Sequence, residues 1–172
     1  LMQGLADGYF VLPYTIGNYL AKDIRTGAIP VDTPEFAAAE KGVQEQLERF
    51  INNKGSKPVD YFHKKLGKIM WDKVGMSRNG KDLKDAVEEI QAIRDEFYKE
   101  VKVPGDLEGF NEELAKAGRV ADFLELGELF AKDALNREES CGGHFREEHQ
   151  TPEGEAKRDK AFQYVAAWEH NG

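Results

Sequence analysis

The chain has 172 residues, enough for one domain with a buried core, or for one domain and part of another. Its net charge of −8 argues against a nucleic-acid partner, because phosphate binding needs a basic face. The single cysteine, Cys141, excludes an intramolecular disulfide and fits a reducing compartment, and no run approaches the roughly 20 apolar residues of a membrane-spanning helix. Because the chain begins at Leu1 without a methionine, we expect it to be part of a longer protein.

Residues 1–25 are apolar and carry three glycines. Each glycine costs roughly 1 kcal/mol in a helix interior, so their presence needs a reason. Gly4 and Gly8 share one helical face, which would let a neighbouring backbone approach closely. We expect this helix to pack on a sheet or on a cofactor domain; the alternative is a weak helix tolerated in a core. Pro13 should remove one backbone hydrogen bond and kink the helix, and residues 26–30 should form a linker.

From residue 32 the apolar residues recur at the spacing of amphipathic helices. Three such stripes end at glycine- or proline-containing turns, and Asn79 is placed to cap the third. A fourth stripe begins near Asn111. Short connections between the stripes predict an all-α fold, an antiparallel helical bundle over residues 31–140. We expect one shared core, containing Val43, Leu47, Phe62, Leu66, Ile90, Phe97, Leu124 and Phe130.

This fourth stripe is the longest predicted helix, and its part from Arg119 onward should organise the bundle. Its apolar set is too wide for a single seam, so several neighbours should pack on it. The adjacent glycines Gly142 and Gly143 predict an abrupt stop. The polar residues 144–148 that follow would form either a surface laid against something else or a solvated, charged turn.

Residues 141–172 lack helical periodicity and should form an irregular, extended arm. Phe162–Trp168 is rich in aromatic and β-branched residues and is the only convincing strand candidate. A lone strand has no pairing partner within the chain, so we expect the arm to dock elsewhere. The charged side chains of Arg146, Glu147, Glu148 and Arg158 would then pair with groups outside the chain.

The candidates for chemistry are few. His144 and His149 are five residues apart, which is the wrong spacing for a helical zinc motif, and Cys141 has no second cluster to complete a tetrahedron. We therefore predict no metal site. Cys141 and His144 as a nucleophile pair would lack an orienting carboxylate. No Gly-x-Gly-x-x-Gly occurs, so the chain has no dinucleotide-phosphate loop of its own.

One stretch carries a resemblance to a known family. The run ADFLELGELFAKDALNREESCGGHFREE resembles the C-terminal helical region of succinate dehydrogenase and fumarate reductase flavoprotein subunits. In that family a helix ends in Arg-x-Glu-Ser-Arg-Gly-Ala-His-x-Arg. The chain matches this motif at Arg137, Glu139, Ser140, Gly142, His144 and Arg146. It departs at Cys141, where the family has arginine, and at Gly143, where alanine is usual, so the contact of that arginine is not carried over.

Two further stretches extend the resemblance over nearly the whole chain. IMWDKVGMSRNGKDLKDAVEEI is similar to the family's Gly-Val-x-Arg pattern through Gly75, Arg78 and Leu83, and LMQGLADGYFVLPYTIGNYLA looks like the last helix of the flavin domain. The resemblance implies three parts. Residues 1–30 would be that helix plus a linker, 31–140 the helical bundle domain of three to four long helices, and 141–172 the arm.

The resemblance also implies a function for the parent protein. It would interconvert succinate and fumarate through covalently bound FAD, and pass electrons to an iron–sulfur subunit and a membrane cytochrome subunit. Such a complex would lie on the cytoplasmic side of the inner membrane, while the fragment itself would be soluble. The family's catalytic groups lie upstream, so we expect the fragment to contain no catalytic residue, to bind no FAD and to be inactive. The direction of the reaction depends on cofactor potential, quinone and membrane partners, which are not encoded here.

The site residues implied by the resemblance are contacts with the parent's own FAD domain. Leu1 aligns with a residue whose backbone lies near the flavin. Arg137, Ser140, His144 and Arg146 would lie at the domain interface. The rival class is a free-standing acidic helical interaction module without flavin chemistry. L-aspartate oxidase and adenylylsulfate reductase share the architecture and rank behind the two succinate–fumarate enzymes.

Overall fold

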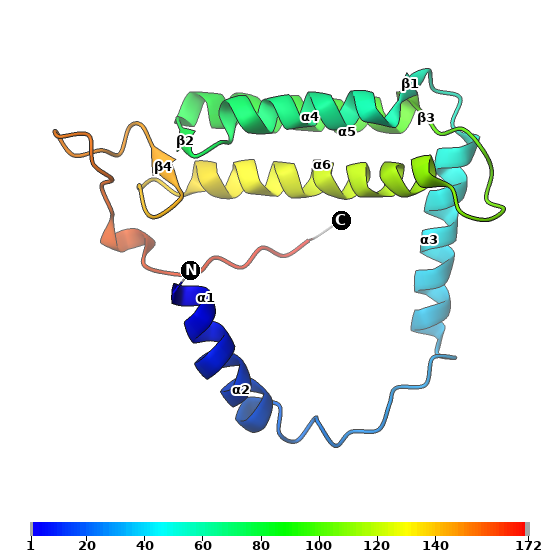
Figure 1. Ribbon diagram of the computed structural model, residues 1–172, viewed down its shortest axis with the longest axis horizontal. Helices are drawn as coiled ribbons and strands as arrows, with labels where there is room; N and C mark the ends of the chain where they lie inside the picture. Colours follow the sequence, from blue (N-terminus) through cyan, green and yellow to red (C-terminus); the bar gives the residue numbers. More distant parts are fainter. Residues whose placement is uncertain (1, 171–172) are drawn as a thin grey trace. The chain divides into compact units, whose positions relative to one another are not determined.

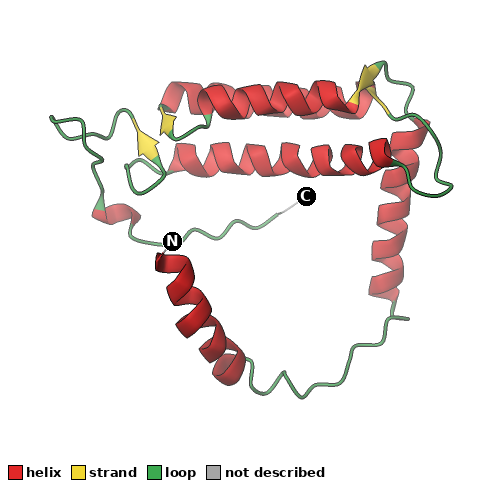
Figure 2. Cartoon of the chain, in the orientation of Figure 1, coloured by secondary structure: helices red, strands yellow, loops and turns green. Residues whose placement is uncertain are grey.

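The computed structural model describes residues 2–170, and most of its secondary structure is helical (Figure 2). The predicted all-α class is therefore confirmed. The chain divides into two compact units, Leu1–Gly42 and Val43–Gly172, with the boundary inside one helix. The elements are α1 Met2–Ala6, η1 Asp7–Val11, α2 Leu12–Tyr14, η2 Thr15–Tyr19, α3 Pro34–Asn52, β1 Lys57–Pro58, α4 Val59–Lys73, β2 Ser77–Arg78, α5 Gly80–Glu100, β3 Val101–Lys102, α6 Glu112–Asn136, β4 Phe145–Arg146 and η3 Lys160–Phe162.

The first unit contains a helical run from α1 to η2 that buries none of its described residues. Pro13 cannot donate a backbone hydrogen bond, and the turns on either side of it are π-helical, with Leu12 N–H bonded to Asp7 O. A short helix in water depends on packing of its apolar face. This run exposes a large apolar set: Met2, Leu5, Tyr9, Phe10, Val11, Leu12, Tyr14, Ile16 and Tyr19.

The second unit is built around α4, α5 and α6, and each of these helices runs antiparallel to the one before it (Figure 1). Their facing sides form one core, joined by Phe50 of α3, whose ring meets Phe97 edge-on at 5.7 Å between centroids. Within the expected core, five residues are buried: Phe62, Leu66, Ile90, Phe97 and Leu124. Leu47 is half-buried at the edge. The prediction was wrong for Val43 and Phe130, which are 57% and 53% exposed.

The central helix α6 approaches α4 closely at Gly127. A Cβ at this position would lie 3.3 Å from both Leu66 Cδ1 and Met70 Sδ, tighter than an ordinary van der Waals contact. The small residue thus lets the two helices interlock, and Ala117, Ala121, Ala131 and Ala134 continue the buried side of α6.

A second apolar face of α6 is left open. Phe123, Leu126 and Phe130 are 41%, 50% and 53% exposed, whereas Leu124 on the opposite side is fully buried. The apolar residues of α6, whose wide spread predicted several neighbouring elements, therefore form two separate faces of the helix. One face packs in the bundle, and the other is solvent-accessible in this chain.

The strands are very short. β1 pairs in parallel with β3, and β2 pairs in parallel with β4, so the arm is joined to the start of α5. The prediction of a strand over Phe162–Trp168 was wrong: the short helix η3 ends at Phe162, and residues 163–170 have no ladder partner among the described residues. A single strand is not stable without a neighbour. The tail is held instead by side chains, including Trp168 Nε1, which donates to Asp133 Oδ1 at 2.8 Å.

Candidate functional site

The residues after α6 form a tight turn. Cys141 N–H donates to His144 O at 2.8 Å, and His144 N–H donates to Cys141 O at 3.1 Å. Gly142 has φ +60°, which fits the first central position of a type II′ turn and favours glycine. Gly143 is not among the glycines with positive φ, and a Cβ there would meet nothing within 4 Å. Only the first glycine is therefore required by the backbone.

Ser140 fastens this turn to β4. Its side chain is fully buried, its Oγ accepts from Arg146 N–H at 2.8 Å, and the same hydroxyl donates to Arg146 O at 3.1 Å. Both backbone groups of Arg146 are thus satisfied by one hydroxyl. The serine of the motif has a structural task inside the chain.

Arg146 caps the C-terminal end of α6. Its guanidinium is buried, and Nη1 donates to Ala134 O and to Leu135 O, each at 3.1 Å. A cation at this end also interacts favourably with the helix dipole. Nε donates to Glu148 Oε2 at 3.3 Å, and Glu148 Oε1 accepts from the N–H of Gly80 at the start of α5. Arg146 and Glu148 therefore link the ends of two helices.

The surroundings of Glu148 change the pKa of its carboxyl group. Partial burial would raise its pKa, but hydrogen bonds from the N–H of Gly80, from its own N–H and from Arg146 together lower the pKa below its ordinary value. Glu147 accepts from Ser77 Oγ at 2.9 Å. Arg146, Glu147 and Glu148 therefore already have partners within the chain, on α6, β2 and α5. Their pairing with groups outside the chain stays a prediction.

Arg137 and Glu139 hold the C-terminal tail. Arg137 Nε donates to Glu139 Oε1 at 2.9 Å, and Nη2 donates to Phe162 O at 2.8 Å. Glu139 is only 3% exposed, and its Oε2 accepts from Asp159 N–H at 2.8 Å. The backbone hydrogen bond from Asp159, together with Arg137, keeps the pKa of Glu139 below its ordinary value.

His144 lies between two groups that fix its tautomer. Arg78 Nη1 is 2.7 Å from His144 Nδ1, and Arg137 O is 2.9 Å from His144 Nε2. A guanidinium can only donate, so Nδ1 accepts and the proton resides on Nε2, which donates to the carbonyl. Burial lowers the pKa of His144, and the charges of Arg78, Arg146 and Arg137 lower it further, against the opposing effect of the Arg137 carbonyl. The imidazole is therefore neutral near pH 7.

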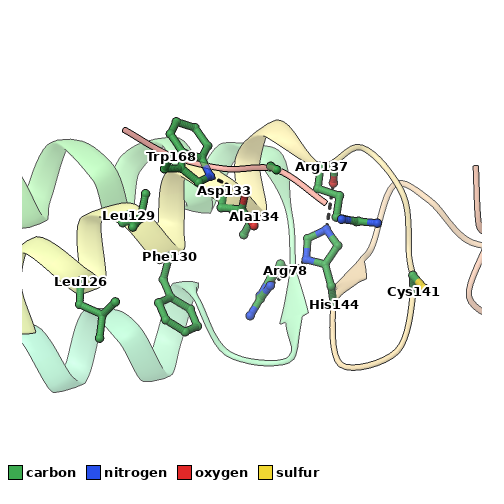
Figure 3. Close-up of a pocket in the computed structure, with 11 residues that line it drawn as sticks. Arg78, Leu126, Leu129, Phe130, Asp133, Ala134, Arg137, Cys141, His144 and Trp168 are labelled. Atoms are coloured by element: carbon green, nitrogen blue, oxygen red, sulfur yellow. Dashed lines mark hydrogen bonds between the residues drawn. The ribbon is translucent and has the colours of Figure 1, made fainter. Parts of the chain in front are cut away.

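A pocket of about 530 Å³ opens beside this histidine (Figure 3). Arg78, Arg137, His144 and Cys141 line its polar end. Its apolar part continues along α6, with Leu126, Leu129 and Phe130, and Trp168 contributes from the tail. Across residues 2–170 no group of three or more histidine, cysteine, aspartate or glutamate side chains converges to hold a metal ion. The arrangement offers hydrogen-bond donors beside an apolar wall.

Comparison with known proteins identifies the chain. The family described as "Fumarate reductase flavoprotein C-term" matches residues 63–172. The chain belongs to this family. It corresponds to the C-terminal part of the fumarate reductase and succinate dehydrogenase flavoprotein subunits, which are oxidoreductase components.

Relatives of this family match most of the chain. The fumarate reductase flavoprotein subunit of Helicobacter pylori strain J99 is 31% identical over 134 residues, covering 76% of the chain and 18% of the relative. An uncharacterised FAD-dependent oxidoreductase of Methanocaldococcus jannaschii is 36% identical over 143 residues, covering 77% of the chain and 25% of the relative. The chain thus spans about a fifth to a quarter of these relatives.

Solved structures agree with this assignment. The Mycobacterium smegmatis Sdh1 complex in the apo form has a TM-score of 0.61 at 29% identity, over 75% of this chain and 21% of that chain. A quinol-fumarate reductase with menaquinol molecules has a TM-score of 0.63 at 22% identity, over 78% of this chain and 22% of that chain, and shows the fold. Within residues 2–170 of the chain, no helix is both long enough and apolar enough to cross a membrane.

The structure brings the four expected interface residues into one cluster. Ser140 and Arg146 are used internally, whereas Arg137 and His144 reach the pocket. Leu1, the expected flavin contact, lies outside the described residues. Sequence reasoning gave no pocket role to Arg78, although the Gly-Val-x-Arg stretch had marked it, and it missed Asp133. No glycine-rich phosphate loop occurs in the sequence, so these residues do not fit FAD by themselves.

Proposed function

We propose that this chain is the part of a succinate dehydrogenase or fumarate reductase flavoprotein subunit that packs on its FAD domain and contributes no catalytic group. The parent subunit would interconvert succinate and fumarate through FAD, which supplies the redox chemistry when bound. Electrons would pass to an iron–sulfur subunit, and a membrane cytochrome subunit would hold the complex at the cytoplasmic side of the inner membrane. The family match carries this proposal.

Two exposed apolar surfaces support a packing role. The helical run Met2–Tyr19 buries no described residue, and the Leu126 and Phe130 side chains of α6 are about half exposed. Large contiguous apolar patches mark interaction sites in soluble proteins. In the first unit, Cβ atoms at Gly4 and Gly8 would meet nothing within 4 Å, which leaves room for the close backbone approach predicted from sequence. The rest of the flavin domain would cover both surfaces.

The cofactor experiment compares the isolated chain with the intact subunit. The intact subunit should retain FAD after dialysis and oxidise succinate or reduce fumarate, because it contains the flavin domain. The isolated chain should show no flavin absorbance after incubation with FAD and dialysis, and no turnover. Stoichiometric flavin retention by the isolated chain would overturn the proposal, as would an intact subunit without flavin.

A second experiment addresses the packing surface. In the intact subunit, Phe130→Glu should loosen the docked domain and reduce flavin retention, because it places a charge in an apolar contact. Phe110→Glu, at a side chain that is 88% exposed in the loop before α6, is the matched control and should leave retention unchanged. Equal behaviour of the two variants would show that α6 is not the packing surface.

A further inference from the structure

Arg78 is the one guanidinium at the pocket that is held in place entirely by neutral groups. Its Nε donates to Val74 O at 3.2 Å and to Gly75 O at 2.6 Å, and its Nη1 donates to His144 Nδ1 at 2.7 Å. The backbone of Arg78 is also held, because β2 pairs with β4 and Arg78 lies opposite Arg146 in the register. The side chain is therefore ordered before any partner arrives, which removes much of the entropic cost of a contact.

The guanidinium of Arg78 has no ion-pair partner within the described chain. The other buried or half-buried guanidiniums of the second unit each have a carboxylate: Arg94 has Glu128, Arg137 has Glu139, and Arg146 has Glu148. Among residues 2–170 no carboxylate forms an ion pair with Arg78. The acid that shares its pocket, Asp133, accepts from the Trp168 indole and acts on Arg78 only at longer range.

The surroundings of Arg78 suit a docked acid. Half-buried charges are costly without a partner, and an ion pair strengthens when an apolar contact excludes water from it. Figure 3 shows Arg78 between Phe130 and His144, so the cation lies at the edge of the exposed face of α6. The neutral imidazole leaves the guanidinium charge intact, because Nδ1 accepts and carries no charge of its own.

We propose that Arg78 anchors the docking interface by pairing with a carboxylate side chain of the flavin domain. This inference rests on the proposed function and adds the chemistry of one contact. The occupant is taken to be protein because the apolar wall continues along α6, and because the chain spans only 18% of its H. pylori relative, which leaves most of the subunit to supply the acid. His144 is the positioning residue that aims the guanidinium.

The test introduces an amine at position 78 of the intact subunit. Arg78→Lys keeps the positive charge, and a carbodiimide couples an amine to a carboxylate in direct contact without a spacer. Mass spectrometry of the digested product should find an amide between position 78 and an aspartate or glutamate upstream of Leu1. Arg78→Gln, which has neither amine nor charge, is the matched control and should give no such product at this position.

Hydrogen exchange supplies a second readout in the same subunit. Arg78→Gln should speed exchange across residues 126–133 by roughly 10- to 100-fold, because it leaves the flavin-domain acid without its partner. Unchanged exchange in the core peptides of α5 would show that the variant is folded. A wild-type subunit without flavin or activity would refute the proposed function itself.

Other outcomes would refute only the role of Arg78. These are an active, flavin-containing wild-type subunit in which position 78 couples only to Asp133, or in which Arg78→Gln leaves exchange at residues 126–133 unchanged. If succinate or fumarate alone protected the Arg78 peptide in the isolated chain, the pocket would be a small-molecule site, and the proposed protein contact would be wrong.

Discussion

Replacing Arg146 by methionine tests whether the end of α6 is stabilised from inside the chain. Methionine has a similar length but removes the charge and every hydrogen-bond donor. In the native chain this guanidinium is 5% exposed and donates to Ala134 O and Leu135 O. The substitution would leave these carbonyls without a donor and Glu148 without its cation.

The expected loss follows from these contacts. A hydrogen bond from a charged donor contributes about 1.5–3 kcal/mol, and breaking a buried charged contact by removing one partner costs about 3–5 kcal/mol. Because Glu148 is partly exposed and keeps the Gly80 N–H, we take the lower end, about 3 kcal/mol of unfolding free energy. For a chain of this size that corresponds to roughly 6–12 °C in Tm.

The assay is urea unfolding, monitored by circular dichroism at 222 nm. The dependence of the unfolding free energy on urea concentration should be the same in all variants, so that their stabilities can be compared. Arg146→Lys should lose about half as much unfolding free energy, because lysine keeps a cation at the helix end but lacks the several planar N–H donors of the guanidinium. Arg158→Met, at an exposed position of the same arm, should change stability by less than about 0.5 kcal/mol. If Arg146→Met were as stable as Arg158→Met, the capping role would be refuted.

Leu124→Ala should cost about 2–5 kcal/mol in urea unfolding, whereas Leu126→Ala on the open face of α6 should cost less than about 1 kcal/mol; similar losses would contradict the assigned orientation. Gly143→Ala should stabilise the chain by about 0.4–1 kcal/mol, while Gly142→Ala should destabilise it, because only Gly142 has positive φ. The lowered pKa of His144 means that the unfolded chain takes up its proton first. Stability should therefore fall as pH drops below about 6.5, and His144→Gln should flatten this fall; an unchanged pH profile in that variant would contradict it.

The helices were predictable because their signals are local. Asn79 caps α5 as expected, with its side chain accepting from Asp82 N–H at 2.8 Å, and Asn111 caps α6 in the same way. The stripes of α4 and α5 point inward because helical spacing alone places their apolar residues on one face. Phe130 was misplaced because spacing cannot distinguish an apolar face that packs within the chain from an apolar face that stays exposed in it.

The contacts of the motif were not predictable from spacing. Arg146 pairs in register with Arg78, far away along the chain, so nothing local indicated that its guanidinium would turn back onto α6. The strand expected over Phe162–Trp168 had suitable residue types but no partner, and pairing decides whether a strand forms. Arg78 could have been noticed as a cation in a resembling stretch, but its lack of a carboxylate is visible only in three dimensions.

The motif after α6 divides into residues that face into the chain and residues that face the pocket, and this division would let one short stretch serve both folding and the proposed docking. Ser140 and Arg146 satisfy backbone groups and close the end of the helix. That closure places His144 against the carbonyl of Arg137, where its second ring nitrogen accepts from Arg78. The position of the Arg78 guanidinium thus depends, through His144, on the cap that Arg146 forms at the end of α6. A substitution that loosens the cap should therefore weaken docking without touching the docking surface.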